Sequence, residues 1–159
     1  MLRILDGTVE WLVAQGRTAQ WGTEPWSTRP ALVGRAAGRI ERGEARVAVL
    51  DGELAGVISL SGTPASYVRP ADEPELYVTL LATERRLKNH GVGSALLDEA
   101  RAEARRQGLG LLRVDCYAGD DGKLRAYYRS QGFTEVEPFT VSRKGEPDWP
   151  GMLLAQRLA

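Results

Sequence analysis

The chain has 159 residues, of which 43% are hydrophobic and 26% are charged, and its formal net charge is zero. Length and composition of this kind are typical of one globular domain with a hydrophobic core, so we expect a single domain over residues 1–159. The balanced charge argues against nucleic acid or an anionic membrane surface as the main partner.

Periodicity and turn residues predict alternating helices and strands without internal repeats. In chain order, the predicted elements are a strand at 2–5, helices at 8–15 and 30–42, strands at 44–50, 54–61 and 75–82, a helix at 92–107, a strand at 111–116, a helix that ends before Gly132, and strands at 133–141 and 152–158. Irregular loops are expected at 21–27 and 147–151.

Particular residues mark the predicted boundaries. Pro30 suits the first position of its helix, with Ser27 or Thr28 as the capping residue. Asp51-Gly52 is a strong signal for a two-residue hairpin turn between two strands.

The most informative segment is a basic turn between the strand at 75–82 and the helix at 92–107. It contains Lys88-x-x-Gly91-x-Gly93. A turn of this kind places free backbone N–H groups at a helix N-terminus, where the helix dipole favours negative charge. Glycine lets a bulky anion come close because it has no Cβ. We therefore expect the turn to bind a phosphate or pyrophosphate.

Two common phosphate-binding motifs are excluded. Leu96 stands where a dinucleotide-binding fingerprint needs its third glycine, and Ser94 follows Gly93 where a P-loop needs lysine. A basic cluster at 85–88 lies beside the turn and is expected to help with phosphates, the alternative being a solvated loop.

A second motif lies downstream at Tyr128, Gly132 and Phe133. Gly132 is the predicted left-handed residue that ends a helix, and Phe133 opens the next strand. Asp120 or Asp121 is the predicted cap at the start of that helix.

Together, the two motifs resemble the GNAT superfamily of acetyl-CoA-dependent N-acetyltransferases over about residues 75–140. The first is similar to the family's Arg/Gln-x-x-Gly-x-Gly/Ala signature, with Lys88 in place of Arg or Gln. The second is similar to the family's Tyr that precedes a Gly-Phe pair by four residues, while Asp121 stands where the family often has Asn. The resemblance implies an α/β (α+β) fold with a mixed, mostly antiparallel sheet of about seven strands and about four flanking helices.

The resemblance also implies a reaction, in which acetyl-CoA as co-substrate transfers its acetyl group directly to a primary amine in a ternary complex. Tyr128 would be the general acid for the departing sulfur, because a phenol is protonated at neutral pH; the alternative is an aromatic side chain that packs beneath the sheet. Glu75 is the closest match to the family's base and Asp115 is a second candidate, the alternative for each carboxylate being a solvated or salt-bridged role.

Backbone groups dominate the implied binding site for acetyl-CoA. The main chain of Leu81 and Thr83 would pair with the pantetheine arm, amides from Asn89 through Ser94 would hold the pyrophosphate, and the His90 side chain would face solvent. The implied cofactor-binding residues are Leu81, Ala82, Thr83, Lys88, Asn89, His90, Gly91, Val92, Gly93, Ser94 and Asp121.

The acceptor side is represented by an aromatic loop with Trp21, Glu24 and Trp26, which forms one wall of the acceptor pocket in this family, and by Asp115. Aromatic rings beside a carboxylate can hold an amine by cation–π and charge contacts. The alternative is that both tryptophans fill the core. We expect a small-molecule amine as substrate. The rival functions are acetylation of a protein N-terminus or lysine, a non-catalytic acyl-CoA-binding module and, least favoured, a nucleotide-binding protein.

Cys116 is the only cysteine, which rules out an intramolecular disulfide and a metal site built from cysteines, and we expect no metal. With His90 in the turn, a Cys–His nucleophilic pair is not expected either. No segment reaches the ~18 apolar residues of a membrane span, and residues 1–7 turn polar too early for a signal peptide. We expect a cytoplasmic protein, and the resemblance allows a homodimer.

Overall fold

The computed structural model describes residues 1–119 and 121–159, which form two compact units. The first unit comprises Met1–Leu60 and Leu80–Asp98, and the second comprises Ser61–Thr79 and Glu99–Ala159. Across the described residues, none of the helices is long and apolar enough to cross a membrane.

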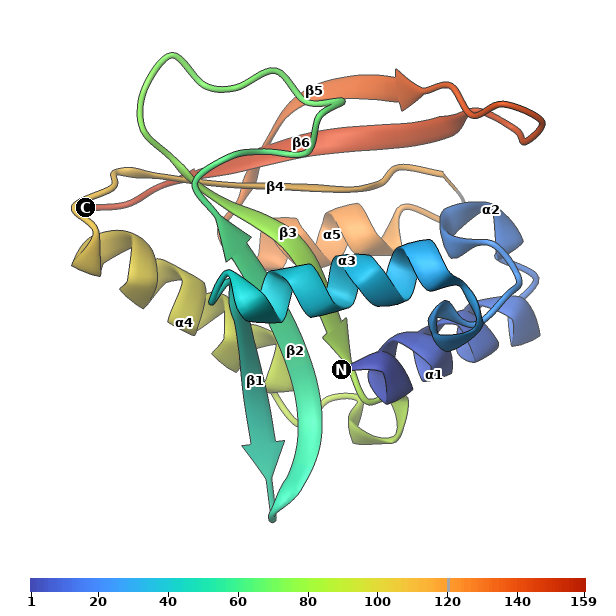
Figure 1. The fold of residues 1–159 in the computed structure, drawn as a ribbon. Helices are drawn as coiled ribbons and strands as arrows, with labels where there is room; N and C mark the ends of the chain where they lie inside the picture. The colour runs from blue at the N-terminus through green and yellow to red at the C-terminus, as the bar shows by residue number, and fades with distance from the viewer. Residues whose placement is uncertain (120) are drawn as a thin grey trace. The chain divides into compact units, whose positions relative to one another are not determined.

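Helices and strands follow one another in the order drawn in Figure 1. They are α1 (Leu2–Ala14), α2 (Thr18–Trp21), the 3-10 helix η1 (Trp26–Thr28), α3 (Pro30–Glu41), β1 (Ala45–Leu50), β2 (Glu53–Ser61), β3 (Leu76–Thr83), the 3-10 helix η2 (Arg85–Leu87), α4 (Val92–Arg106), β4 (Leu111–Tyr117), α5 (Lys123–Ser130), β5 (Thr134–Val141) and β6 (Trp149–Arg157).

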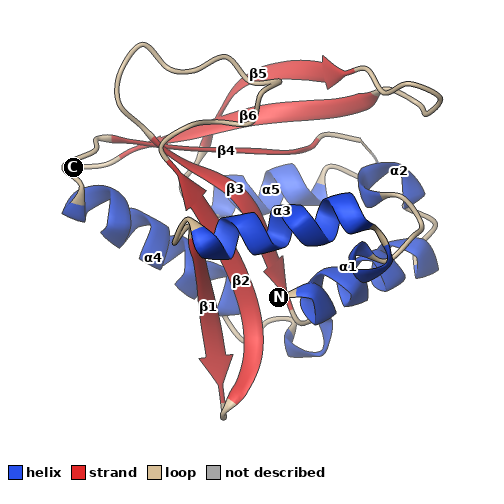
Figure 2. Cartoon of the chain, in the orientation of Figure 1, coloured by secondary structure: helices blue, strands red, loops and turns tan. Residues whose placement is uncertain are grey.

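The strands hydrogen-bond in the order β1-β2-β3-β4-β6-β5. The β3–β4 pair is parallel, whereas β1–β2, β4–β6 and β5–β6 are antiparallel. This confirms the predicted mixed, mostly antiparallel sheet of the α+β class. The described residues form six strands and five α-helices, against the expected seven and four (Figure 2).

The missing strand is the one predicted at 2–5, which is wrong because these residues open α1. Ile4 and Leu5 are buried on the face of the helix that also carries Thr8, Val9 and Leu12. The pattern of apolar and polar residues over only four positions fits a strand as well as a helix. The helix is recognised only when the spacing of apolar residues is followed over several turns.

Residues Met1–Leu60 belong to the first unit, and the core of this unit explains the burial of α1. Ile4 and Leu5 pack with Val57 of β2 and with Leu80 and Ala82 of β3. The β1–β2 hairpin turns at Asp51 and Gly52, whose φ angles of 52° and 79° are both positive, as a type I′ turn requires. The hairpin prediction is therefore confirmed.

Two capping predictions are wrong. Arg29, not Ser27 or Thr28, occupies the cap of α3, and the Thr28 hydroxyl instead donates a hydrogen bond to the Pro25 carbonyl at 2.8 Å. Pro30 does hold the first turn of α3 as predicted.

Gly122, not an aspartate, caps α5. Asp121 still accepts the Lys123 N–H at 3.1 Å with its side chain. Asp120, the other predicted cap, lies outside the described residues.

Two loops contain more regular structure than predicted. The loop at 21–27 includes the end of α2 and the start of η1. The loop at 147–151 is shorter because β6 begins at Trp149, which pairs with Val141, and Gly151 pairs with Phe139.

The second unit contains β4, whose side chains alternate between two faces of the sheet. Leu112, Val114 and Cys116 are buried on one face, and Arg113 and Asp115 belong to the other. Two of the second unit's candidate functional residues are at the polar face of this strand: Asp115 itself and Glu75, which pairs with Arg113.

Candidate active site

The turn after η2 has the backbone geometry of an anion-binding site. Asn89 and Gly91 both adopt the left-handed conformation, with φ angles of 68° and 75°. The Gly91 carbonyl accepts the Ala95 N–H at 2.9 Å, so the helical hydrogen bonds of α4 begin there. The amides of Val92, Gly93 and Ser94 therefore form the first turn of a 15-residue helix that carries no acidic residue in that turn.

One predicted phosphate donor is already engaged. The His90 N–H donates to the Leu87 carbonyl at 3.2 Å. The His90 ring is exposed, with Nδ1 3.1 Å from the Lys88 carbonyl oxygen. The main-chain donors that remain at the helix start are those of Val92 to Ser94.

The basic cluster before the turn divides into engaged and unengaged cations. The Arg85 guanidinium lies 4.2 Å from the centroid of the Trp11 ring, and Arg86 forms an ion pair with Glu53. Lys88 is exposed, and within residues 1–119 and 121–159 it has no ion-pair partner. Of the three cations, Lys88 is the one most available to an anion.

Gly56 of β2 determines how closely α4 approaches the sheet. A Cβ at this position would lie 2.9 Å from both Val92 Cγ1 and Leu96 Cδ1, and 3.2 Å from the Ala82 carbonyl oxygen. The sequence motifs do not include this glycine, because its role depends on a helix that lies far along the chain. It allows the first turn of α4 to pack directly on the β2 and β3 backbones.

The aromatic loop of the first unit packs against the core of that unit. Trp21 and Trp26 lie with ring centroids 5.5 Å apart, and both are partly buried against the cluster formed by α1, β2 and β3. Glu24 is exposed between them in sequence. The Asp6 side chain of α1 accepts a hydrogen bond from the Ser27 N–H at 3.0 Å, which links the loop to α1.

Tyr128 is buried in the last turns of α5 in the second unit, with 5% of its surface exposed. Its ring packs edge-on against Tyr127 and Phe133, with centroid distances of 5.4 and 5.8 Å. Burial raises the pKa of the Tyr128 phenol well above 10.0, so the hydroxyl keeps its proton at neutral pH.

The helix end that follows Tyr128 is the one predicted. Gly132 has a φ of 87°, and the Phe133 N–H donates to the Tyr128 carbonyl at 3.1 Å. The Gly132 N–H donates to the Arg129 carbonyl at 3.0 Å. This pair of hydrogen bonds is a Schellman motif, which fixes the backbone of Tyr128.

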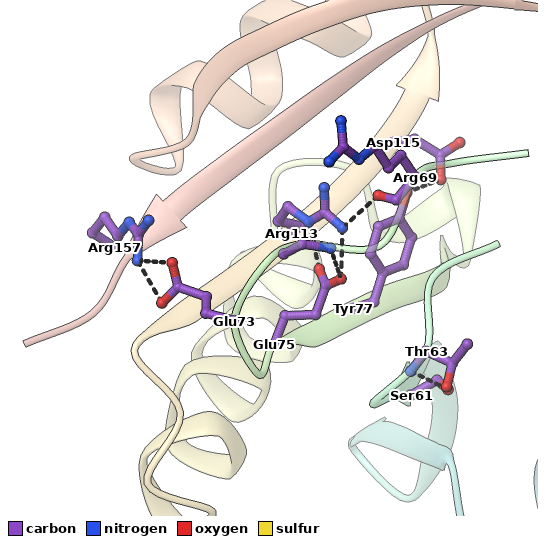
Figure 3. A network of polar contacts seen from close by, with 10 residues as sticks. Ser61, Thr63, Arg69, Glu73, Glu75, Tyr77, Arg113, Asp115 and Arg157 are labelled. Carbon is purple, nitrogen blue, oxygen red and sulfur yellow. Dashed lines mark hydrogen bonds and ion pairs between the residues drawn. The ribbon is translucent and has the colours of Figure 1, made fainter.

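Glu75 is held in a buried ion pair with Arg113 of β4 (Figure 3). Arg113 Nη2 donates to Glu75 Oε1 at 2.5 Å, and Nε donates to the other oxygen. The Ala71 N–H also donates to Oε1, at 3.1 Å, and Arg113 donates to the Arg69 carbonyl at 3.0 Å. Glu75 therefore anchors the segment before β3 to β4, which is the salt-bridged alternative considered from the sequence, although its partner and its burial were not predicted.

Asp115 lies two residues further along the same face of β4. Its Oδ1 accepts a hydrogen bond from the Tyr77 hydroxyl at 2.6 Å, and its Oδ2 accepts one from the Tyr67 hydroxyl at 3.3 Å. Loss of hydration raises the pKa of the Asp115 carboxyl above 3.8, although both phenols oppose the rise.

Asp121 and Cys116 complete the predicted residues of the second unit. The Asp121 carboxylate pairs with Lys123 Nζ at 2.7 Å, so it is engaged within its own turn. Cys116 is a buried free thiol, and burial raises its pKa to about 12.

The predicted residues are divided between the two units. The first unit holds Trp21, Glu24, Trp26, Leu81, Ala82, Thr83, Lys88, Asn89, His90, Gly91, Val92, Gly93 and Ser94. The second holds Glu75, Asp115, Asp121 and Tyr128.

Comparison with known proteins gives one family. The acetyltransferase (GNAT) family matches residues 7–133. The chain is also 30% identical, over 128 residues, to the uncharacterized N-acetyltransferase YesJ of Bacillus subtilis (strain 168). That match covers 74% of this chain and 71% of the relative.

Solved structures share the fold. The ribosomal-protein-alanine N-acetyltransferase from Brucella melitensis is 22% identical with a TM-score of 0.71, and the match covers 99% of this chain and 91% of that one. A putative streptothricin acetyltransferase from Bacillus anthracis str. Ames, in complex with acetyl coenzyme A, is 15% identical with a TM-score of 0.59. That match covers 72% of this chain and 61% of the other.

Proposed function

Because the chain belongs to the acetyltransferase (GNAT) family of N-acetyltransferases, we propose that residues 1–159 form one catalytic domain that transfers the acetyl group of acetyl-CoA to a primary amine of a small molecule. The observation that carries the proposal is the turn before α4. Its first-turn amides follow a left-handed Gly91, and the first turn itself contains no acidic residue. Such a site suits a pyrophosphate.

The first unit would bind the cofactor through its backbone. The amides of Val92, Gly93 and Ser94 donate to the pyrophosphate, and Lys88 adds positive charge. No heavy atom lies within 4 Å of a Cβ built on Gly91, so the space beside this residue is open. The main chain of Leu81 to Thr83 pairs with the pantetheine arm as a neighbouring strand would.

Tyr128 would act as the general acid. The amine nitrogen attacks the thioester carbonyl, the carbon–sulfur bond breaks, and the phenol gives its proton to the departing sulfur. Because the pKa of Tyr128 is raised, the phenol is still protonated when the carbon–sulfur bond breaks. Cys116, whose pKa is raised to about 12, is a poor nucleophile, which agrees with direct transfer without an acyl-enzyme.

The proton that leaves the amine needs a base. Glu75 is the candidate by resemblance, but its charge is committed to a buried ion pair with Arg113, whereas the donors to Asp115 are uncharged phenols. Asp115 has the raised pKa of a carboxylate that accepts a proton more readily than an ordinary one. Asp115 is therefore the stronger candidate for the base.

Calorimetric titration with acetyl-CoA, coenzyme A and ATP tests the binding step. We expect stoichiometric binding of both coenzyme A forms and none of ATP. Gly91→Val should abolish binding, while Gly108→Val is the matched control, because Gly108 has a similar φ of 68° beyond the other end of α4. Failure of the wild-type protein to bind either coenzyme A form would contradict the proposed cofactor site at the turn before α4. Equal binding by folded Gly91→Val would contradict it as well.

Thiol release with a panel of amines tests the chemistry. Tyr128→Phe should lower kcat by about 10²-fold or more, with acetyl-CoA affinity unchanged. Tyr127→Phe is the control, since it removes the neighbouring phenol of the same helix. Equal turnover in Tyr128→Phe and wild type would remove Tyr128 from the mechanism.

A further inference from the structure

Among the residues that the structure describes, no basic side chain pairs with the Asp115 carboxylate. Its two oxygens accept hydrogen bonds from the hydroxyls of Tyr67 and Tyr77, which are uncharged donors. Arg113, on the same face of β4, is committed to Glu75 and to the Arg69 carbonyl (Figure 3). Over residues 1–119 and 121–159, Asp115 has no ion-pair partner. A half-buried carboxylate of this kind is stabilised by any cation that reaches it.

Four aromatic rings accompany this carboxylate in the second unit. The Tyr67 ring stacks on Phe139 with a centroid distance of 5.7 Å and lies 6.3 Å from the Trp149 ring. Trp149 in turn lies 5.6 Å from the Tyr117 ring. Tyr67 is 47% exposed, so ligands have access to the cluster from solvent.

Two glycines leave the space that two of these rings occupy. A Cβ on Gly151 of β6 would overlap the Phe139 ring, with Cε2 at 2.5 Å and Cε1 at 2.8 Å. A Cβ on Gly119 would overlap the Tyr117 ring in the same way, with Cε1 at 2.7 Å. A larger residue at either position would therefore force the ring beside it to move.

We infer that Asp115 and the rings of Tyr67 and Trp149 bind the ammonium group of an amine whose neighbouring carbon body is apolar. The inference rests on the proposed function and names its acceptor class. Charge attraction to the carboxylate and cation–π attraction to tyrosine and tryptophan rings favour the same guest. A neutral molecule of the same shape gains neither contribution.

The hydrogen bonds to Asp115 also favour ammonium over guanidinium. A guanidinium group binds a carboxylate best through two parallel hydrogen bonds, one to each oxygen. Here each oxygen already accepts a phenol hydroxyl, from Tyr77 or Tyr67. An ammonium group is a compact charge that needs one free acceptor direction, so it fits the remaining lone pairs better.

Binding of phenethylammonium to the full chain, measured by calorimetry without acetyl-CoA, tests the inference. We expect phenethylammonium to bind at least tenfold more tightly than phenethyl alcohol and more tightly than phenethylguanidinium. Asp115→Asn should lower the affinity at least tenfold, and Trp149→Leu should also lower it. Asp72→Asn is the matched control, because Asp72 is an exposed carboxylate of the same unit with a side chain 95% accessible.

Each outcome decides the matter. Equal affinity for the ammonium and the alcohol, or wild-type affinity in folded Asp115→Asn, would overturn the inference. If Asp115→Asn does not fold, the comparison of charged and neutral probes on the wild-type protein still decides. A protein that binds phenethylammonium but neither binds acetyl-CoA nor releases thiol would refute the proposed function alone. Acetyl transfer that is indifferent to Asp115 and Trp149 would refute this inference and the role of Asp115 as base, and would leave the acetyltransferase function itself standing.

Discussion

Replacing Glu75 by glutamine is expected to destabilise the protein without impairing the chemical step. The side chains of Glu75 and Arg113 are only 4% and 8% exposed, so the substitution leaves a buried guanidinium without its counter-charge. Breaking a buried pair by removing one partner costs about 3–5 kcal/mol. For a chain of this length, that loss corresponds to a fall in Tm of about 6–20 °C.

Thermal and urea unfolding followed by circular dichroism measure this loss. Glu73→Gln is the matched control, because Glu73 also pairs with an arginine, Arg157 at 2.7 Å, but both side chains are exposed. That substitution should cost less than about 1 kcal/mol. A double variant, Glu75→Leu with Arg113→Met, should recover most of the stability, since it removes both charges from the interior.

The same variants separate a structural glutamate from a base. If Glu75 only anchors the segment before β3, kcat measured well below the Tm of each variant stays near the wild-type value. A cost as small as that of Glu73→Gln would refute the burial argument. A fall in kcat of about 10²-fold with an unchanged Tm would instead identify Glu75 as the base.

Three further predictions concern single side chains. Asp115→Asn should not lower the Tm at pH 7. Folding raises the pKa of Asp115, so this carboxyl group stabilises the native state at pH values below its unfolded pKa near 3.8. The stabilisation is lost as the pH rises through the folded pKa, and at pH 7 the substitution therefore removes no favourable contribution from this group. The Tm difference between variant and wild type should therefore shrink or reverse as the pH falls; a Tm that drops at pH 7 would contradict this. Cys116, with its pKa near 12, should resist a thiol reagent at pH 8 until the chain is unfolded in denaturant, and rapid labelling of the native protein would contradict its burial. Gly56→Ala should destabilise the protein and weaken acetyl-CoA binding because its Cβ meets α4, whereas Gly34→Ala, in open space within α3, should stabilise by up to about 1 kcal/mol; equal unfolding energies would refute the packing argument.

Local features of this chain were predictable because short segments encode them. The turn before α4 depends on Gly91 and on the start of one helix, and the end of α5 depends on Gly132. Both lie within a few residues of the groups they position. The hairpin at Asp51-Gly52 is predictable for the same reason.

Long-range partnerships were not predictable from sequence spacing. Glu75 meets Arg113 across 38 positions, and Asp115 meets Tyr67 across 48, because β3 and β4 pair in a register that depends on the whole sheet. The error at residues 2–5 has a different origin. Ile4 and Leu5 belong to a helical face that becomes visible only when Val9 and Leu12 are counted with them.

The stacking of Arg85 on Trp11 gives the protein an internal optical signal. Arg85 belongs to η2, which leads directly into the turn at Lys88, and its guanidinium lies 4.2 Å from the centroid of the indole of α1. A cation over an indole ring changes the emission of that fluorophore, so any ligand that shifts η2 alters the light that Trp11 emits. In a variant in which phenylalanine replaces the other three tryptophans, the wavelength and intensity of that emission would follow occupancy of the turn in real time, without a label.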